Sequence, residues 1–329
     1  MAVIARFERL LQGFAPRDDV AGLVEGDLPS AERLAALLAS VDTHGDLPEA
    51  SRLPRIRPVL LALSARAAGA DEVDPDLQLA AELLHAALTL HDAALGQPGG
   101  RRRRLARRVI RRGGAWLGAN RVMLRSLELV RHLPEAGILD DLMDTLSAFA
   151  DVQDLAEGLL DGGLPDASLW DEHADGHTGA LFSFCCRAGG QIAGRGPGDV
   201  AALGRYGRHL GRMWHVAEDV CLLRGPDAGE HLAGRALVGR PMLPVAIGIL
   251  REPTLGPVWR SLVDGDSAAA DRVLDGLRRT RAIQGSRAVV VREGWQAQQA
   301  LQRFEGTPYR QGLERLVSGL GGAPFSDAG

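Results

Sequence analysis

Apolar residues recur every three or four positions along most of the chain, which is the period of an amphipathic α-helix. The clearest stretches are PSAERLAALLASV, RIRPVLLALSARAAG and PDLQLAAELLHAALTLHDAAL. Ser30 precedes the first stretch and Glu32 follows in its first turn, a pattern typical of a helix N-terminus. The same period predicts a long helix over 101–133, two helices within 134–162, and further helices that begin near Ala167, Val200 and Glu230.

Glycine and proline clusters separate these stretches, as in GQPGG, DGGLPD, GRGPGD, RGPDAGE and REPTLGP. One short β-branched run, AVVVREG, has helical flanks, and the sequence contains no alternating strand pattern and no repeat of fixed period. No linker is polar enough to separate two hydrophobic cores. We therefore predict an all-α bundle of roughly a dozen helices forming a single domain over 29–329, after an N-terminal helical segment at 1–28.

The charge balance argues against a polyanionic partner. The chain has 329 residues, 38 basic side chains that are all arginine, 42 acidic ones and a net charge of -4. An arginine-rich stripe over 101–112 has the charge to contact phosphates, but it lacks aromatic stacking partners and any recognisable DNA-binding motif. We therefore predict a solvated basic face and no nucleic-acid partner.

The cellular location of the protein is predicted from three features of the sequence. No apolar run reaches membrane-spanning length, and the N-terminus has no signal-peptide cleavage pattern. The cysteines are odd in number and include an adjacent pair, so they do not form a disulfide framework. These features predict a cytoplasmic protein with no transmembrane segment.

Six short motifs occur in a fixed order: PRIRP, LLHAALTLHD, GGRRRR, HTGALF, YGRHLGRMWHVAED and GRPMLP. Together they resemble the trans-polyprenyl diphosphate synthase family, which has an all-α isoprenoid synthase fold and condenses allylic diphosphates with isopentenyl diphosphate. The resemblance extends from about Arg52 to the last predicted helix, TPYRQGLERLVSGL. It implies a dimer formed through central helices, for which residues 114–133 would supply the surface.

The resemblance also implies a set of diphosphate-binding residues. Arg55 and Arg57 match the arginines of the family's G-K-R-x-R-P motif, in which Pro54 replaces the lysine. His177 stands where the family has a lysine, so its charge depends on pH. The complete predicted set is Arg55, Arg57, His85, Arg101, Arg102, His177, Thr178 and Arg240.

The metal-binding motifs of the family are incomplete in this chain. The family holds Mg²⁺ with two DDxxD motifs, whereas this chain reads DAALG at 92–96 and EDVCL at 218–222. Asp92, Glu218 and Asp219 remain, but alanine, glycine and leucine offer no ligand to a hard cation. Arg235 stands where the family has a further aspartate. We therefore expect Mg²⁺ binding to be weakened or lost, and an arginine can partly replace a metal beside a phosphate.

Two functions remain open at this point. The first is a non-catalytic or regulatory partner of an active prenyl diphosphate synthase, or an isoprenoid-diphosphate binder, working as a homodimer or heterodimer. The second is an active, divergent prenyltransferase or terpene-synthase-like enzyme that acts on an allylic diphosphate with one metal ion or an arginine. Loss of ligands argues against the family reaction but not against every reaction.

Three smaller features have plainer interpretations. His173 and His177 are four residues apart, a spacing that suits a transition metal, but no third ligand is evident and a helix surface is favoured. The adjacent Cys185 and Cys186 lie on an apolar face and are predicted to be core. Two tryptophans are predicted to pack between helices, Trp116 and Trp214.

Overall fold

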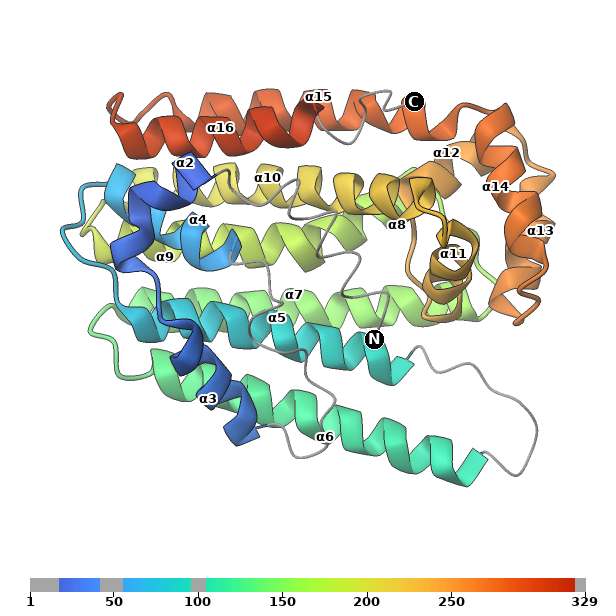
Figure 1. Ribbon diagram of the computed structural model, residues 1–329, viewed down its shortest axis with the longest axis horizontal. Coiled ribbons are helices and arrows are strands. Elements are labelled where there is room, and N and C mark those ends of the chain that lie inside the picture. Colours follow the sequence, from blue (N-terminus) through green and yellow to red (C-terminus); the bar gives the residue numbers. More distant parts are fainter. Residues whose placement is uncertain (1–17, 42–55, 96–104, 323–329) are drawn as a thin grey trace.

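The computed structural model describes residues 18–41, 56–95 and 105–322, and within these ranges the regular elements are all helices (Figure 1). The all-α prediction is confirmed. In chain order the elements are α2 (Asp18–Ala21), η1 (Gly22–Asp27), α3 (Ala31–Val41), α4 (Ile56–Ala67), α5 (Pro75–Leu95), α6 (Leu105–Val130), α7 (Ala136–Leu160), α8 (Ala167–Ala174), η4 (Asp175–Gly179), α9 (Ala180–Ile192), α10 (Pro197–Arg224), α11 (Ala228–Leu237), α12 (Leu243–Arg251), α13 (Leu255–Val263), α14 (Ala269–Arg279), α15 (Ala282–Leu301) and α16 (Pro308–Gly322).

Local sequence signals account for several helix boundaries. The backbone N–H of Arg33 donates to Ser30 Oγ at 3.1 Å, so Ser30 caps α3 as its position predicts. The prediction of two helices within 134–162 is wrong, because α7 runs unbroken through this region. Residues 138–157 contain neither glycine nor proline, so nothing there interrupts the backbone hydrogen bonds. AVVVREG lies inside α15, where its helical neighbours outweigh its β propensity.

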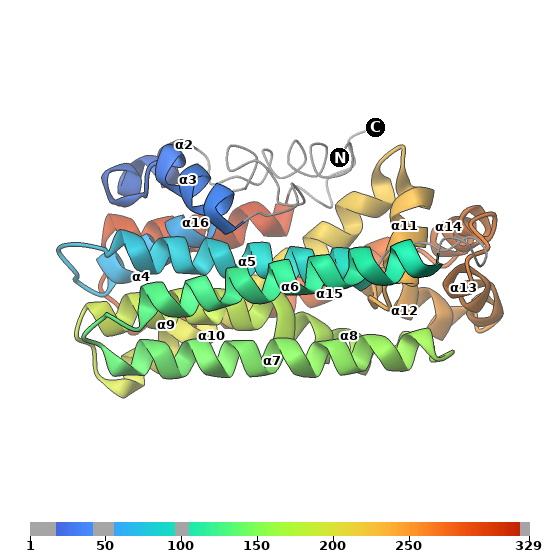
Figure 2. The same ribbon diagram turned by 90° about the horizontal axis from the view of Figure 1, so that it is seen from below.

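Helices α9 and α10 form the centre of the bundle, with α4 and α7 packed on α9 and α15 packed on α10 (Figures 1 and 2). Two glycines permit a close approach between the central pair. A Cβ atom at Gly207 would overlap the carbonyl oxygen of Phe182, and one at Gly211 would overlap that of Thr178. Glycine at these two positions therefore brings the start of α9 and the turn before it directly against α10.

A second, smaller hydrophobic cluster lies at one end of the bundle, among the short helices α11 to α14 (Figure 1). At the N-terminal end, Val20 and Val24 belong to the main core, while the predicted boundary at residue 28 stays a prediction. Within the described part of the chain, no helix combines the length and the apolar character needed to cross a membrane.

Candidate functional site

One turn of π-helix, η4, connects α8 to α9 without a break and carries two of the predicted site residues. Its His177 and Thr178 are both buried, and so is His173 in the preceding helix. A single π turn adds one residue per turn and is frequently found at functional sites, because it redirects side chains that an α-helix would place elsewhere. Here the turn packs on α10, where glycine allows the close contact.

A directed chain of hydrogen bonds begins at Arg240 and ends at His215. Arg240 Nη2 lies 2.9 Å from His177 Nε2, and because a guanidinium can only donate, Nε2 is the acceptor. His177 Nδ1 therefore carries the proton and donates to Thr178 Oγ1 at 3.1 Å. The Thr178 hydroxyl in turn donates to His215 Nδ1 at 3.0 Å. In this arrangement both imidazoles are neutral.

Three imidazole rings gather at this point. The ring centroids of His173 and His177 are 5.5 Å apart, and His215 lies 5.1 Å from the first and 5.9 Å from the second. Burial lowers the pKa of His173 and of His215 well below the ordinary value, and neighbouring histidines and arginines lower it further. The interpretation of His173 and His177 as a helix surface is therefore wrong. Even so, the described residues contain no group of three His, Cys, Asp or Glu placed to hold a metal ion.

Arg57 lies at the start of α4 and is held by a buried carboxylate of α5. Its Nε and Nη2 each donate to Glu82 at 2.9 Å, and the exposed fractions of the two side chains are 3% and 0%. One turn further along α5, burial lowers the pKa of His85 well below its ordinary value, and the charges of Arg57, His177 and Arg240 add to the effect. Arg240 is in hydrogen-bond contact with His177, and the charges of both groups and of Arg57 act on His85, so the fold brings these four predicted residues near one another.

The carboxylates of the second acidic motif are both engaged by other groups of the protein. Glu218 Oε1 pairs with Arg235 Nη2 at 2.9 Å, with exposed fractions of 19% and 12%. Asp219 is buried and accepts a hydrogen bond at 3.1 Å from the backbone N–H of Leu243. Burial raises the pKa of Asp219 to about 7, against the opposing effect of the Arg235 charge.

Several predicted site residues lie outside the described part of the chain. Arg55, Arg101 and Arg102 belong to this group, as does the side chain of Asp92, whose backbone is in α5. The cysteine pair is buried, as predicted, and Trp214 packs against Phe182 with ring centroids 5.9 Å apart. Trp116 of α6 packs edge-on against His91 of α5, with ring centroids 4.5 Å apart, so it also lies between helices as predicted, although its side chain is 39% exposed.

The motifs did not indicate a role for Glu82, nor did they indicate that His215 lies beside His173 and His177. Helical spacing contains a signal for both, since Glu82 lies three residues before His85 and His215 three residues before Glu218. Residues at that spacing share a helix face. A motif identifies the residues that a known site uses. The other residues on the same helix face identify the neighbours that orient those side chains.

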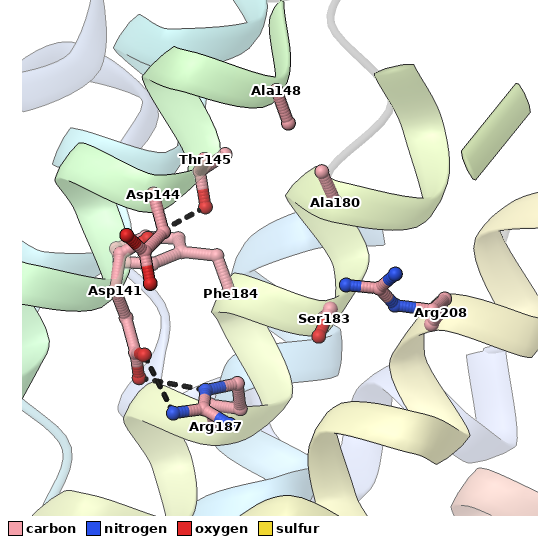
Figure 3. Close-up of a pocket in the computed structure, with 9 residues that line it drawn as sticks. All are labelled: Asp141, Asp144, Thr145, Ala148, Ala180, Ser183, Phe184, Arg187 and Arg208. Atoms are coloured by element: carbon pink, nitrogen blue, oxygen red, sulfur yellow. Dashed lines mark hydrogen bonds and ion pairs between the residues drawn. The ribbon is translucent and has the colours of Figure 1, made fainter. Parts of the chain in front are cut away.

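A pocket of about 180 Å³ lies between α7, α9 and α10 and is lined by none of the predicted site residues (Figure 3). Arg187 and Asp141 form an ion pair at 2.6 Å beside it, and Gln191 donates to the same carboxylate. The pocket is lined by Asp141, Asp144, Thr145, Ala148, Ala180, Ser183, Phe184, Arg187 and Arg208. The ion pair and the hydrogen bond connect α7 to α9, so these polar groups already have a structural role.

Comparison with known proteins finds similarity to polyprenyl diphosphate synthases. No protein-family model matches the chain. It is 26% identical over 294 residues to the geranyl-diphosphate-specific all-trans-nonaprenyl-diphosphate synthase of Rhodobacter capsulatus, covering 86% of this chain and 88% of that protein. It is 24% identical over 275 residues to octaprenyl diphosphate synthase of Escherichia coli, covering 80% and 84% respectively.

A solved structure of polyprenyl synthase from Caulobacter crescentus, complexed with calcium and isoprenyl diphosphate, superposes with a TM-score of 0.71. Sequence identity to it is 23%, and the match covers 92% of this chain and 97% of that one. The common fold, the extent of the sequence match to two curated synthases and the ordered motifs agree with one another. In sequence over most of its length, and in fold, the chain is similar to the trans-polyprenyl diphosphate synthases.

Proposed function

We propose that this protein binds an isoprenoid diphosphate at the cluster around His177 and Arg240 and that its ordinary prenyl-transfer activity is impaired. In this proposal the protein serves as a non-catalytic or regulatory partner of an active prenyl diphosphate synthase. The observation that carries this proposal is the Glu218–Arg235 ion pair at 2.9 Å. It engages a carboxylate that the family reaction would use for Mg²⁺, while Arg57, His85, His177 and Arg240 remain gathered at the site.

The side chains that the structure describes around the second acidic motif do not fit the Mg²⁺ ions of the family. Mg²⁺ requires near-octahedral coordination by several oxygen ligands. Glu218 is paired with Arg235, and Asp219 accepts a backbone hydrogen bond in a buried position. Among the side chains that the structure describes, no three candidate ligands converge. These observations support a loss or weakening of Mg²⁺ binding.

An apolar surface supports the partner role. Leu117 and Leu124 of α6 have exposed fractions of 72% and 61%, and they lie seven residues apart on one helix face. Met143 of α7 is also exposed, and α7 lies beside α6 in the bundle (Figure 2). Large exposed apolar side chains of this kind are typical of protein interfaces. We propose that this α6–α7 face binds either a second copy of the chain or an active synthase.

Calorimetric titration with geranylgeranyl diphosphate in the presence of Mg²⁺, combined with a product assay after addition of isopentenyl diphosphate, tests the proposal. We expect binding of the allylic diphosphate without release of diphosphate and without elongated product. Elongated product or released diphosphate would favour the divergent prenyltransferase or terpene-synthase-like enzyme instead. That alternative is supported by the two curated relatives, both of which are named as synthases. Absence of any binding would contradict the proposed ligand.

A further inference from the structure

Two guanidinium groups converge on the side of the site where the family would hold metal. Arg235 reaches it from α11, and Arg240 from the segment that follows α11. The charges of both groups act on His173 and on His215, which come from α8 and α10. Arg240 Nη2 lies 2.9 Å from His177 Nε2, and Arg235 Nη2 lies 2.9 Å from Glu218, three residues after His215 on α10. Both arginines therefore lie close to the same cluster of buried imidazoles, where solvent screens their charges less than at the surface.

Glu218 fixes one of these arginines in place. The Arg235–Glu218 pair is mostly shielded from solvent and its two atoms lie 2.9 Å apart. A guanidinium is a planar fork of five N–H donors, so it can bind a carboxylate along one edge and phosphate oxygens along another. Because the pair is neutral overall, Glu218 no longer presents an unpaired negative charge to an incoming diphosphate.

The same pair opposes a divalent cation. A metal ion that used Glu218 as a ligand would have to displace Arg235 or accept a positive charge within a few ångströms. Aspartate at position 235 would have the opposite effect, because it would gather a third carboxylate beside Glu218 and Asp219. The residue at position 235 on α11 therefore determines whether this side of the site holds a fixed positive charge or a set of metal ligands.

We propose that the guanidinium of Arg235, oriented by Glu218 and assisted by Arg240, takes the place of the metal ion and binds the diphosphate group of the isoprenoid ligand directly. The inference rests on the proposed function, since it specifies how that ligand is held. It makes binding of the isoprenoid diphosphate independent of Mg²⁺.

The test is calorimetric titration of the full chain with geranylgeranyl diphosphate, once with Mg²⁺ and once with EDTA. For the unaltered protein we expect the same Kd in both. For Arg235→Asp we expect Kd to rise about tenfold or more in EDTA, equivalent to 1.4 kcal/mol or more, and to recover when Mg²⁺ is added. Arg235→Gln removes the charge without adding a ligand, so its binding should be weakened in both conditions.

Arg279→Asp is the matched control, because it breaks an ion pair of similar length, 2.8 Å to Glu252, on the exposed surface of α14. This variant should bind as the unaltered protein does, and circular dichroism verifies that each variant is folded. If Arg235→Asp fails to fold, Arg235→Gln alone decides the matter. Mg²⁺-dependent binding by the unaltered protein, or unchanged binding by both Arg235 variants, would overturn the inference while leaving the proposed ligand intact. Absence of binding in both conditions would contradict the proposed function itself.

Discussion

The orientation of Arg57, a predicted site residue, depends on Glu82, which the motifs do not indicate. Two hydrogen bonds of 2.9 Å orient the Arg57 guanidinium, and Glu82 is completely buried. Burying two charges is unfavourable on its own, so such a pair stabilises the fold only while both partners are present. The same pairing positions Arg57 near His85.

Replacing Glu82 by Gln should therefore lower the free energy of unfolding by about 3–5 kcal/mol, because a buried positive charge loses its partner. Chemical denaturation with urea measures this loss. The matched control is Glu128→Gln, which breaks the exposed Arg125–Glu128 pair at 2.6 Å and should cost less than about 1 kcal/mol. Equal effects of the two substitutions would contradict the role given to the buried pair.

The sequence motifs single out several side chains that the fold places near one another, but not the partners of those side chains. His85, His177 and Arg240 are recognisable from ordered motifs, and the fold does gather them. The ion pairs of Arg57 with Glu82 and of Arg235 with Glu218 join different helices, α4 with α5 and α11 with α10. Such pairs depend on how helices pack, which the local periodicity does not specify.

At the scale of elements, the close packing of α9 on α10 positions the π turn. Glycine at two positions of α10 permits this approach, and Gly207 lies against the backbone of α9 itself. Helical periodicity predicted most of these elements, including the exact bounds of α5, because amphipathic stretches flanked by proline and glycine carry a strong local signal. The π turn was not predicted, since its extra residue follows from tertiary packing rather than from local sequence.

We expect Gly207→Ala to destabilise the protein by about 2 kcal/mol or more, even though alanine is the better helix former, because overpacking forces the backbones of α9 and α10 apart. Thermal unfolding followed by circular dichroism is a suitable measurement. Gly234→Ala is the matched control: it is in α11, with no atom within 4 Å of the added Cβ, and should stabilise by up to about 1 kcal/mol. If Gly207→Ala were also stabilising, the close contact would be refuted.

For the molecule as a whole, the exposed apolar face of α6 and α7 is the feature that bears on assembly. The family resemblance pointed to residues 114–133 as a dimer surface, and the exposed Leu117 and Leu124 lie in that segment. The sequence alone predicts the helix but not which of its faces stays uncovered, because that depends on where α5 and α7 pack.

Substituting Leu117 and Leu124 together by Glu should convert a dimer to a monomer, because it places charges within an apolar interface. Sedimentation velocity of the full chain, alone and mixed with an active polyprenyl diphosphate synthase, measures the change. Leu250→Glu is the control, since Leu250 is also exposed but lies on α12. A monomeric unaltered protein that also ignores the active synthase would contradict the proposed assembly role.

The hydrogen bonds from Arg240 to His215 determine where the protons lie on the histidine rings of the site. A row of groups that both donate and accept can run in either of two senses, and an isolated row would populate both. Arg240 has no acceptor to offer, so it fixes the sense of the whole row from one end. A side chain after α11 thereby decides which nitrogen bears the proton on a ring of α10, with two other residues between them. The position of the proton on His215 therefore depends on Arg240, although the two side chains are not in contact in this row.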